Sequence, residues 1–124
     1  MNEDYQLGLL YLAHLLMSAD GIIDEKEEAA LMRIKTKETI SDAVFREFSH
    51  NVNSLKQKEI YQQGIELLNK CTDAEKLNAF VHLYKMSEVD GTVHVKEVRL
   101  LLYSVKLASI EINDVIEKAK VVHY

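Results

Sequence analysis

The stretch that decides the fold is Asp20-Gly21-Ile22-Ile23-Asp24-Glu25-Lys26-Glu27, because the chain contains a second version of it. Seventy residues later the sequence reads Asp90-Gly91-Thr92-Val93-His94-Val95-Lys96-Glu97. The correspondence continues beyond the motif, since Ile40 matches Ile110. Self-similarity at a fixed interval is the signature of a repeated structural unit. The sequence therefore predicts a two-fold internal repeat with one acidic turn in each half.

The residues around both turns have the spacing of helices. The chain of 124 residues has no proline and only four glycines, so little interrupts a helix from within. Apolar periodicity predicts helices over about 3–18, 24–37, 41–50, 54–70, 72 to the second turn, 96–107 and 111–121. The fourth has no counterpart and joins two halves of three helices, about 3–50 and 73–121. We expect one all-α domain, residues 1–124, of about seven helices.

Details of this pattern predict which helix is buried and where others begin. The first helix is apolar on nearly every side, which is typical of a helix at the centre of a domain. Gly8 within it predicts close approach by another helix, because glycine has no side chain. The other helix starts are predicted from short polar side chains that can accept hydrogen bonds from the first amides of a helix. We expect an N-cap at Ser41, a turn at 51–53, and capping boxes at Ser54 with Gln57 and at Thr72 with Glu75.

Composition argues against several classes of function. The net charge of −5 leaves no basic stripe for nucleic-acid phosphates. The single cysteine, Cys71, cannot form an internal disulfide, which fits a reducing compartment. The most apolar run, 7–19, is shorter than the roughly 20 residues that span a bilayer, and the N-terminus lacks a signal-peptide pattern. We expect a cytoplasmic protein with no nucleic-acid partner and no membrane span.

Each acidic turn matches only part of a calcium-binding loop. Asp20, Gly21 and Glu27 fall on the fifth, sixth and twelfth places of the EF-hand pattern. The first place falls on Leu16 in one copy and on Met86 in the other, and neither side chain supplies an oxygen ligand. The pattern therefore argues against an EF-hand in either half.

At these positions the chain resembles the tellurite-resistance protein B (TerB) family, which includes a domain at the start of some membrane-anchored DnaJ-like co-chaperones. The resemblance is carried by 18–27 and 90–97 and extends over nearly the whole chain. It implies a compact all-helical domain linked to stress or tellurite resistance. It also implies acidic residues that bind metal or partner proteins.

The acids in question lie in both turns. Transferred to this sequence, and including the neighbouring Asp24, the candidate metal ligands are Asp20, Asp24, Glu27, Asp90 and Glu97. His94 stands at the place of Asp24 in the second copy. Oxygen donors favour calcium, magnesium or manganese as the cation, whereas His94 without a second His or Cys gives zinc less support. The same acids could instead only cap helices.

These observations leave two hypotheses of function. In the first, a non-enzymatic stress-response module uses its acidic turns to bind a divalent cation or to dock protein partners, for example a membrane-associated resistance complex. In the second, the acids only cap helices and an exposed apolar groove binds a partner. No nucleophile elbow, Gly-rich phosphate loop or Cys-x-x-Cys motif occurs, so we expect no enzyme. His14 and His82 lie among apolar residues, and we interpret them as hydrogen-bonded core or boundary histidines.

Overall fold

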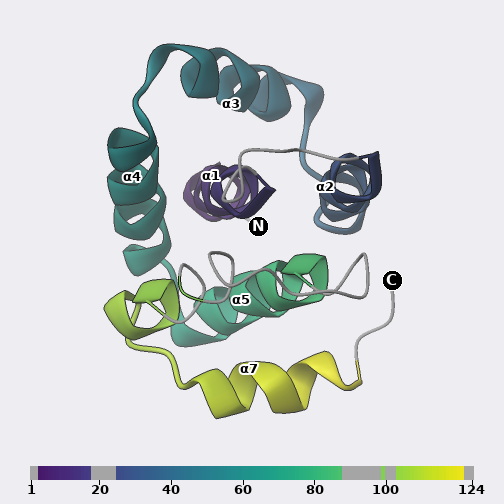
Figure 1. The fold of residues 1–124 in the computed structure, drawn as a ribbon, viewed down its shortest axis with the longest axis vertical. Coiled ribbons are helices and arrows are strands. Elements are labelled where there is room, and N and C mark those ends of the chain that lie inside the picture. The colour runs from purple at the N-terminus through teal and green to yellow at the C-terminus, as the bar shows by residue number, and fades with distance from the viewer. Residues whose placement is uncertain (1–2, 18–24, 88–98, 100–102, 122–124) are drawn as a thin grey trace.

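The computed structural model describes residues 3–17, 25–87, 99 and 103–121, and within them it has helices and no strands (Figure 1). The all-α prediction is confirmed. The helices are α1 (Glu3–Met17), α2 (Glu25–Lys37), α3 (Asp42–Ser54), α4 (Gln57–Asn69), α5 (Asp73–Ser87) and α7 (Ile112–Ala119). Residues 103–107 are also helical and precede α7. No helix in the described part of the chain is long and apolar enough to cross a bilayer.

Helix α1 lies at the centre of the molecule, as its sequence predicts. Figure 1 shows it end-on, with α2, α3, α4 and α5 arranged around it and α7 outside α5. Every described residue of α1 from Tyr5 onwards is buried except His14, which is partly buried. A helix that is apolar on nearly all sides can bury its side chains only when other helices surround it. The other helices therefore form a shell around α1.

The closest packing in this shell is between α1 and α4, where two glycines face each other. A Cβ atom on Gly8 would lie 3.0 Å from Cγ of Leu68 and 3.1 Å from the carbonyl oxygen of Gly64. A Cβ atom on Gly64 would lie 3.2 Å from Cδ2 of Leu12. The close approach predicted at Gly8 is confirmed. The matching role of Gly64 was not anticipated.

Two corners of the chain share one backbone geometry. Thr39 and Ser109, which are seventy residues apart, have positive φ angles of 53° and 60°. In the first corner the Ile40 amide donates to the Lys35 carbonyl at 2.9 Å, and in the second the Ile110 amide donates to a carbonyl five residues earlier at 3.0 Å. This is the six-residue hydrogen bond of a Schellman motif. The spacing agrees with the predicted repeat, but both acidic turns lie outside the described residues, so the repeat stays a prediction.

Two of the predicted caps are confirmed. The Ser41 hydroxyl accepts a hydrogen bond from the Val44 amide at 3.2 Å, which caps α3. Thr72 and Glu75 form the expected reciprocal box, since each side chain accepts from the other's amide, at 3.2 and 3.0 Å. Both contacts satisfy amides at a helix start that have no partner within the helix.

The turn predicted at 51–53 is wrong, because α3 continues to Ser54. The side-chain amide of Asn51 donates from Nδ2 to the hydroxyl of Tyr11 at 2.7 Å, and this contact with α1 takes the place of a local turn. Ser54 does not cap α4, since its hydroxyl donates back to the carbonyl of His50. The capping contact of α4 is instead the Lys56 amide donating to the Glu59 carboxylate, at 3.1 Å.

Candidate functional site

The candidate metal ligands fall almost entirely outside the described residues. Asp20, Asp24, Asp90, His94 and Glu97 lie outside the described residues, and Glu27 is in α2 but its side chain is not described. Among the side chains that are described, no group of three or more His, Cys, Asp or Glu could hold a metal ion. The cation site therefore stays a prediction.

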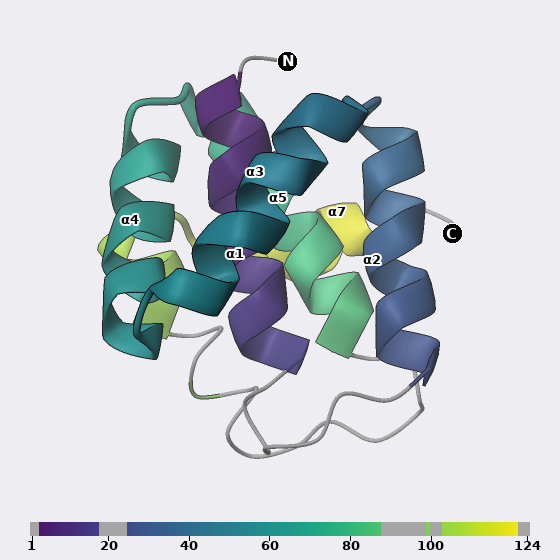
Figure 2. The ribbon, with the colours of Figure 1, turned by 90° about the horizontal axis from the view of Figure 1, so that it is seen from above.

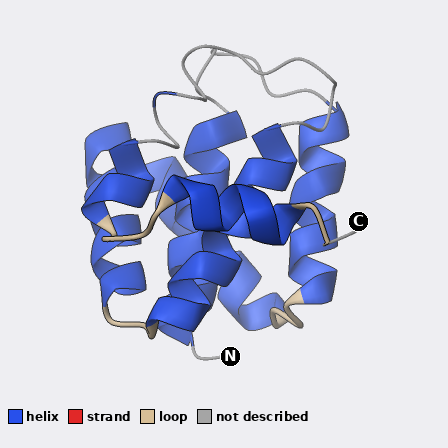
Figure 3. Cartoon of the chain, turned by 90° about the horizontal axis from the view of Figure 1, so that it is seen from below, coloured by secondary structure: helices blue, strands red, loops and turns tan. Residues whose placement is uncertain are grey.

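The helix ends that flank the two acidic segments lie at one end of the molecule. Figure 2 shows that the end of α1, the start of α2 and the end of α5 point the same way, and Figure 3 shows the bundle from the opposite side. The corresponding residues are Met17, Glu25 and Ser87. The first acidic segment joins Met17 to Glu25, and the second follows Ser87. We call the end of the bundle formed by these three helix ends the acidic end, after the two acidic stretches that follow Met17 and Ser87 in the sequence.

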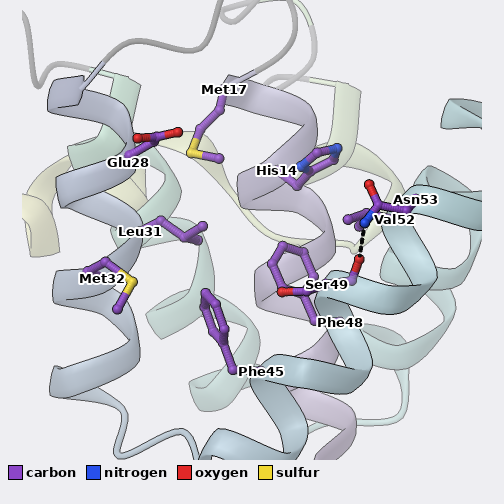
Figure 4. Close-up of a pocket in the computed structure, with 10 residues that line it drawn as sticks. All are labelled: His14, Met17, Glu28, Leu31, Met32, Phe45, Phe48, Ser49, Val52 and Asn53. Atoms are coloured by element: carbon purple, nitrogen blue, oxygen red, sulfur yellow. Dashed lines mark hydrogen bonds between the residues drawn. The ribbon is translucent and has the colours of Figure 1, made fainter.

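A groove of about 420 Å³ opens between α2 and α3, with α1 as its floor (Figure 4). We call it the α2–α3 groove. It is lined by His14 and Met17 of α1, by Glu28, Leu31 and Met32 of α2, and by Phe45, Phe48, Ser49, Val52 and Asn53 of α3. Met17 is the last residue of α1, and Glu28 lies in the first turn of α2. The groove therefore reaches the acidic end.

Most of the groove's surface is apolar, and its walls are aromatic and thioether side chains. The rings of Phe45 and Phe48 meet edge to face with centroids 5.5 Å apart. Phe48 is only 3% exposed and belongs to the core, whereas Met32 on the facing helix is 49% exposed. Isolated apolar side chains are common on protein surfaces, but an apolar concavity is typical of binding sites. The groove can hold an apolar group of moderate size.

Polar groups lie at the edges of the groove. His14 is partly buried and its ring meets the Phe48 ring edge to face, with centroids 6.0 Å apart. Burial lowers the pKa of His14, which favours its neutral form. Glu28 is exposed, and among the described lining residues it is the only one with a charge. Toward the other end of α2, Lys35 pairs with Asp42 at 2.8 Å.

A second polar cluster ties three helices together in the interior. Oε1 of Glu38, just after α2, is 2.5 Å from Nε2 of His82 in α5. The same oxygen accepts from the Asn78 amide at 2.7 Å and from the Tyr5 hydroxyl of α1 at 3.2 Å. Burial would raise the pKa of Glu38, but the hydrogen bond and charge of His82, with the bonds from Asn78 and Tyr5, bring that pKa below its usual value.

We assign this cluster a structural role, because its side chains satisfy one another inside the fold. The prediction that His82 is a hydrogen-bonded core histidine is confirmed, since its side chain is buried against Glu38. The part of Glu38 was missed. A signal existed: Asn78 and His82 are four residues apart in the otherwise largely apolar stretch 77–84, so two polar side chains share one helix face and need a partner.

The family comparison agrees with this architecture. The model of the family "Tellurite resistance protein TerB" matches residues 6–121 of the chain. The chain belongs to the TerB family. Comparison with curated proteins gave no match, and comparison with solved structures gave none either.

The match includes both acidic segments and every residue that lines the α2–α3 groove. This chain is therefore a TerB-like, tellurite-resistance-associated domain of all-α fold. The groove belongs to the TerB domain itself, because α1, α2 and α3 all lie within the matched region apart from the first residues of α1.

Proposed function

We propose that this TerB domain is a cytoplasmic, non-enzymatic stress-response module that docks partner proteins at its acidic end. The observation that carries the proposal is that the α2–α3 groove reaches this end through Met17 and Glu28. A partner bound there would bury apolar surface in the groove and meet acidic residues beside it. A membrane-associated resistance complex is one partner of this kind.

The exposed side chain of Met32 makes the docking proposal testable. In Met32→Glu a carboxylate projects into the groove, and a partner could then bind only by burying an unpaired charge. Leu107 is a matched control, because it is 44% exposed and does not line the groove. Each variant would be expressed in a strain from which the gene has been deleted, and tellurite tolerance would be measured.

We expect Met32→Glu to lose most of the restored tolerance while Leu107→Glu keeps it. Thermal melts of both purified variants would establish that each is folded. Equal tolerance in the two variants would contradict docking in the groove.

A second candidate function is divalent-cation binding by the acidic segments. It is favoured by the common position of the end of α1, the start of α2 and the end of α5 at one end of the bundle (Figure 2). In the sequence, Asp20 follows Met17 and Asp90 follows Ser87, each by three residues. The proposed ligands are Asp20, Asp24, Glu27, Asp90 and Glu97, with His94 as a further donor. Calcium, magnesium and manganese suit these oxygen donors better than zinc does.

The cation proposal is tested by thermal melts of metal-stripped protein with each of these four cations. A ligand at about 100 times its Kd stabilises the native state by about 2.7 kcal/mol, which raises Tm by several degrees. We expect one cation to give this shift and the double variant Asp20→Asn/Glu27→Gln to remove it. If no cation shifts the Tm of the parent chain and the double variant is merely less stable, these acids are helix caps and not ligands.

A further inference from the structure

We propose that the α2–α3 groove binds one face of an amphipathic helix from a partner protein, and that this helix carries Lys or Arg beside Glu28. The inference rests on the proposed docking function and deepens it by naming the chemistry of the partner. Three features of the groove support it: its length, the adaptable side chains in its walls and the negative charge at its edge.

The groove has the length of a short helical segment. On α3 the lining residues run from Phe45 to Asn53 at positions i, i+3, i+4, i+7 and i+8, which form one face over about two turns. Two turns of a helix are about 11 Å long. A partner helix that lies along this face would place apolar side chains at i, i+3 or i+4, and i+7 into the groove.

Each wall of the groove has a fixed and an adaptable part. Leu31 of α2 and Phe48 of α3 are buried in the domain core and give each wall a fixed base. Met32 is largely exposed, and Phe45 and Val52 are half-buried, so these three side chains have surface left to bury. Methionine has an unbranched and polarisable side chain that follows the shape of different apolar partners. The groove therefore suits leucine-like anchors rather than one rigid ligand.

Charge determines which amphipathic helix fits. Glu28 is exposed at the edge of the groove, and Glu25 is exposed one turn earlier on the same helix. Neither lysine nor arginine occurs among the described residues that line the groove. Lys35 lies over the Phe45 ring, 5.7 Å from its centroid, but its charge is paired with that of Asp42. The whole chain has a net charge of −5. A basic helix would meet opposite charge in this groove, whereas an acidic helix would meet like charge, which disfavours binding.

The test uses three synthetic peptides of equal length as probes. The first places leucine at i, i+3, i+4 and i+7 with lysine on the opposite flanks. The second keeps the leucines and replaces each lysine by glutamate. The third has the composition of the first in a scrambled order that removes the apolar face. Binding to the whole chain would be measured by fluorescence anisotropy at low and physiological salt.

We expect the lysine peptide to bind about tenfold more tightly than the glutamate peptide, a difference of about 1.4 kcal/mol. The scrambled peptide should bind more weakly than the lysine peptide, and Met32→Glu should weaken binding of the leucine peptides while Leu107→Glu leaves it unchanged. Glu28→Lys should remove or reverse the preference for lysine without unfolding the domain, because Glu28 is exposed.

Equal binding of the lysine and glutamate peptides, equal binding of the scrambled peptide, or no binding of any peptide would overturn the inference. These failures are distinct from failure of the docking proposal. If the peptides fail but Met32→Glu still loses tellurite tolerance, docking in the groove stands and only the basic helix is rejected. If the peptides fail and Met32→Glu keeps its tolerance, both proposals are wrong.

Discussion

Glu38 and His82 lie 2.5 Å apart, Oε1 to Nε2, although they are 44 residues apart in the sequence. Glu38 follows α2 and His82 is in the middle of α5, so their contact joins the two halves of the chain. The Asn78 amide and the Tyr5 hydroxyl bind the same carboxylate oxygen. One carboxylate thus connects α1, the end of α2 and α5.

The first prediction concerns the dependence of stability on pH. The pKa of Glu38 is lower in the folded chain than its usual value, so the unfolded chain binds the proton more tightly. The contribution of Glu38 to stability is therefore fully present above the ordinary pKa of a glutamate, and it is lost as pH falls through the lowered value in the folded state. Glu38→Gln should reduce this acid-dependent loss. Urea denaturation of the parent chain and of Glu38→Gln at several pH values measures how the free energy of unfolding depends on pH.

At neutral pH, Glu38→Gln should lower the free energy of unfolding by about 1.5–3 kcal/mol, the usual range for a hydrogen bond to a charged group. Glu66→Gln provides the control, because Glu66 is exposed on α4 and should change stability by less than about 0.5 kcal/mol. The structural role of the cluster would be refuted if both variants had the same stability as the parent chain at all pH values.

The second prediction concerns the contact between α1 and α4. Alanine at Gly8 would place a methyl group 3.1 Å from a backbone oxygen that can move only with α4. We expect Gly8→Ala to destabilise the domain by about 1–3 kcal/mol, which exceeds the helix propensity that alanine adds. Gly64→Ala should cost less, because its nearest neighbour is the side chain of Leu12. Urea denaturation measures the free energy of unfolding of both variants. A Gly8→Ala variant that is more stable than Gly64→Ala would contradict the prediction.

The sequence contained enough information for the fold but not for all of its boundaries. The burial of α1 was predictable, because a helix with apolar residues on nearly all sides removes them from water only at the centre of a domain. The box formed by Thr72 and Glu75 was predictable, because both partners are local. The turn expected at 51–53 was wrong because Asn51 bonds to Tyr11, forty residues earlier, and this pairing is not visible in local sequence.

The candidate site shows the same division between local and distant information. Apolar residues of α2 and α3 could be assigned to helix faces, but the groove exists only because α2 and α3 are set apart above α1. The cluster of Glu38, His82, Asn78 and Tyr5 joins α1, the corner after α2 and α5, which are remote from one another in the chain. Such arrangements depend on packing angles, which single-sequence periodicity does not provide.

The third prediction uses the two corners with positive φ. The left-handed conformation is unfavourable for residues with a Cβ atom, and Thr39 is also β-branched. Thr39→Gly should therefore stabilise the domain by about 0.5–1 kcal/mol, after the greater flexibility of glycine in the unfolded chain is subtracted. Ser109→Gly should have a smaller effect. Thr36→Gly, within α2, is the control and should destabilise by a similar amount. Thermal melts measure all three, and a lower Tm for Thr39→Gly would refute the strain.

The fourth prediction concerns the start of α5. Thr72→Ala removes the oxygen that accepts from the Glu75 amide, and it should lower stability by about 1 kcal/mol. Thr72→Ser keeps that oxygen and should retain most of the stability. If the alanine and serine variants unfold at the same urea concentration, the capping contact does not contribute.

The central position of α1 has a consequence for how the chain is made. Residues 3–17 leave the ribosome before the helices that cover them, and α5 is complete only at residue 87. At synthesis rates of about 5–20 residues per second, α1 waits roughly 4–14 s for its last neighbour. During that time an all-round apolar segment is accessible to chaperones and to other nascent chains. Aggregation during expression, rather than loss of binding, is therefore the first symptom to expect from any truncation that removes α5.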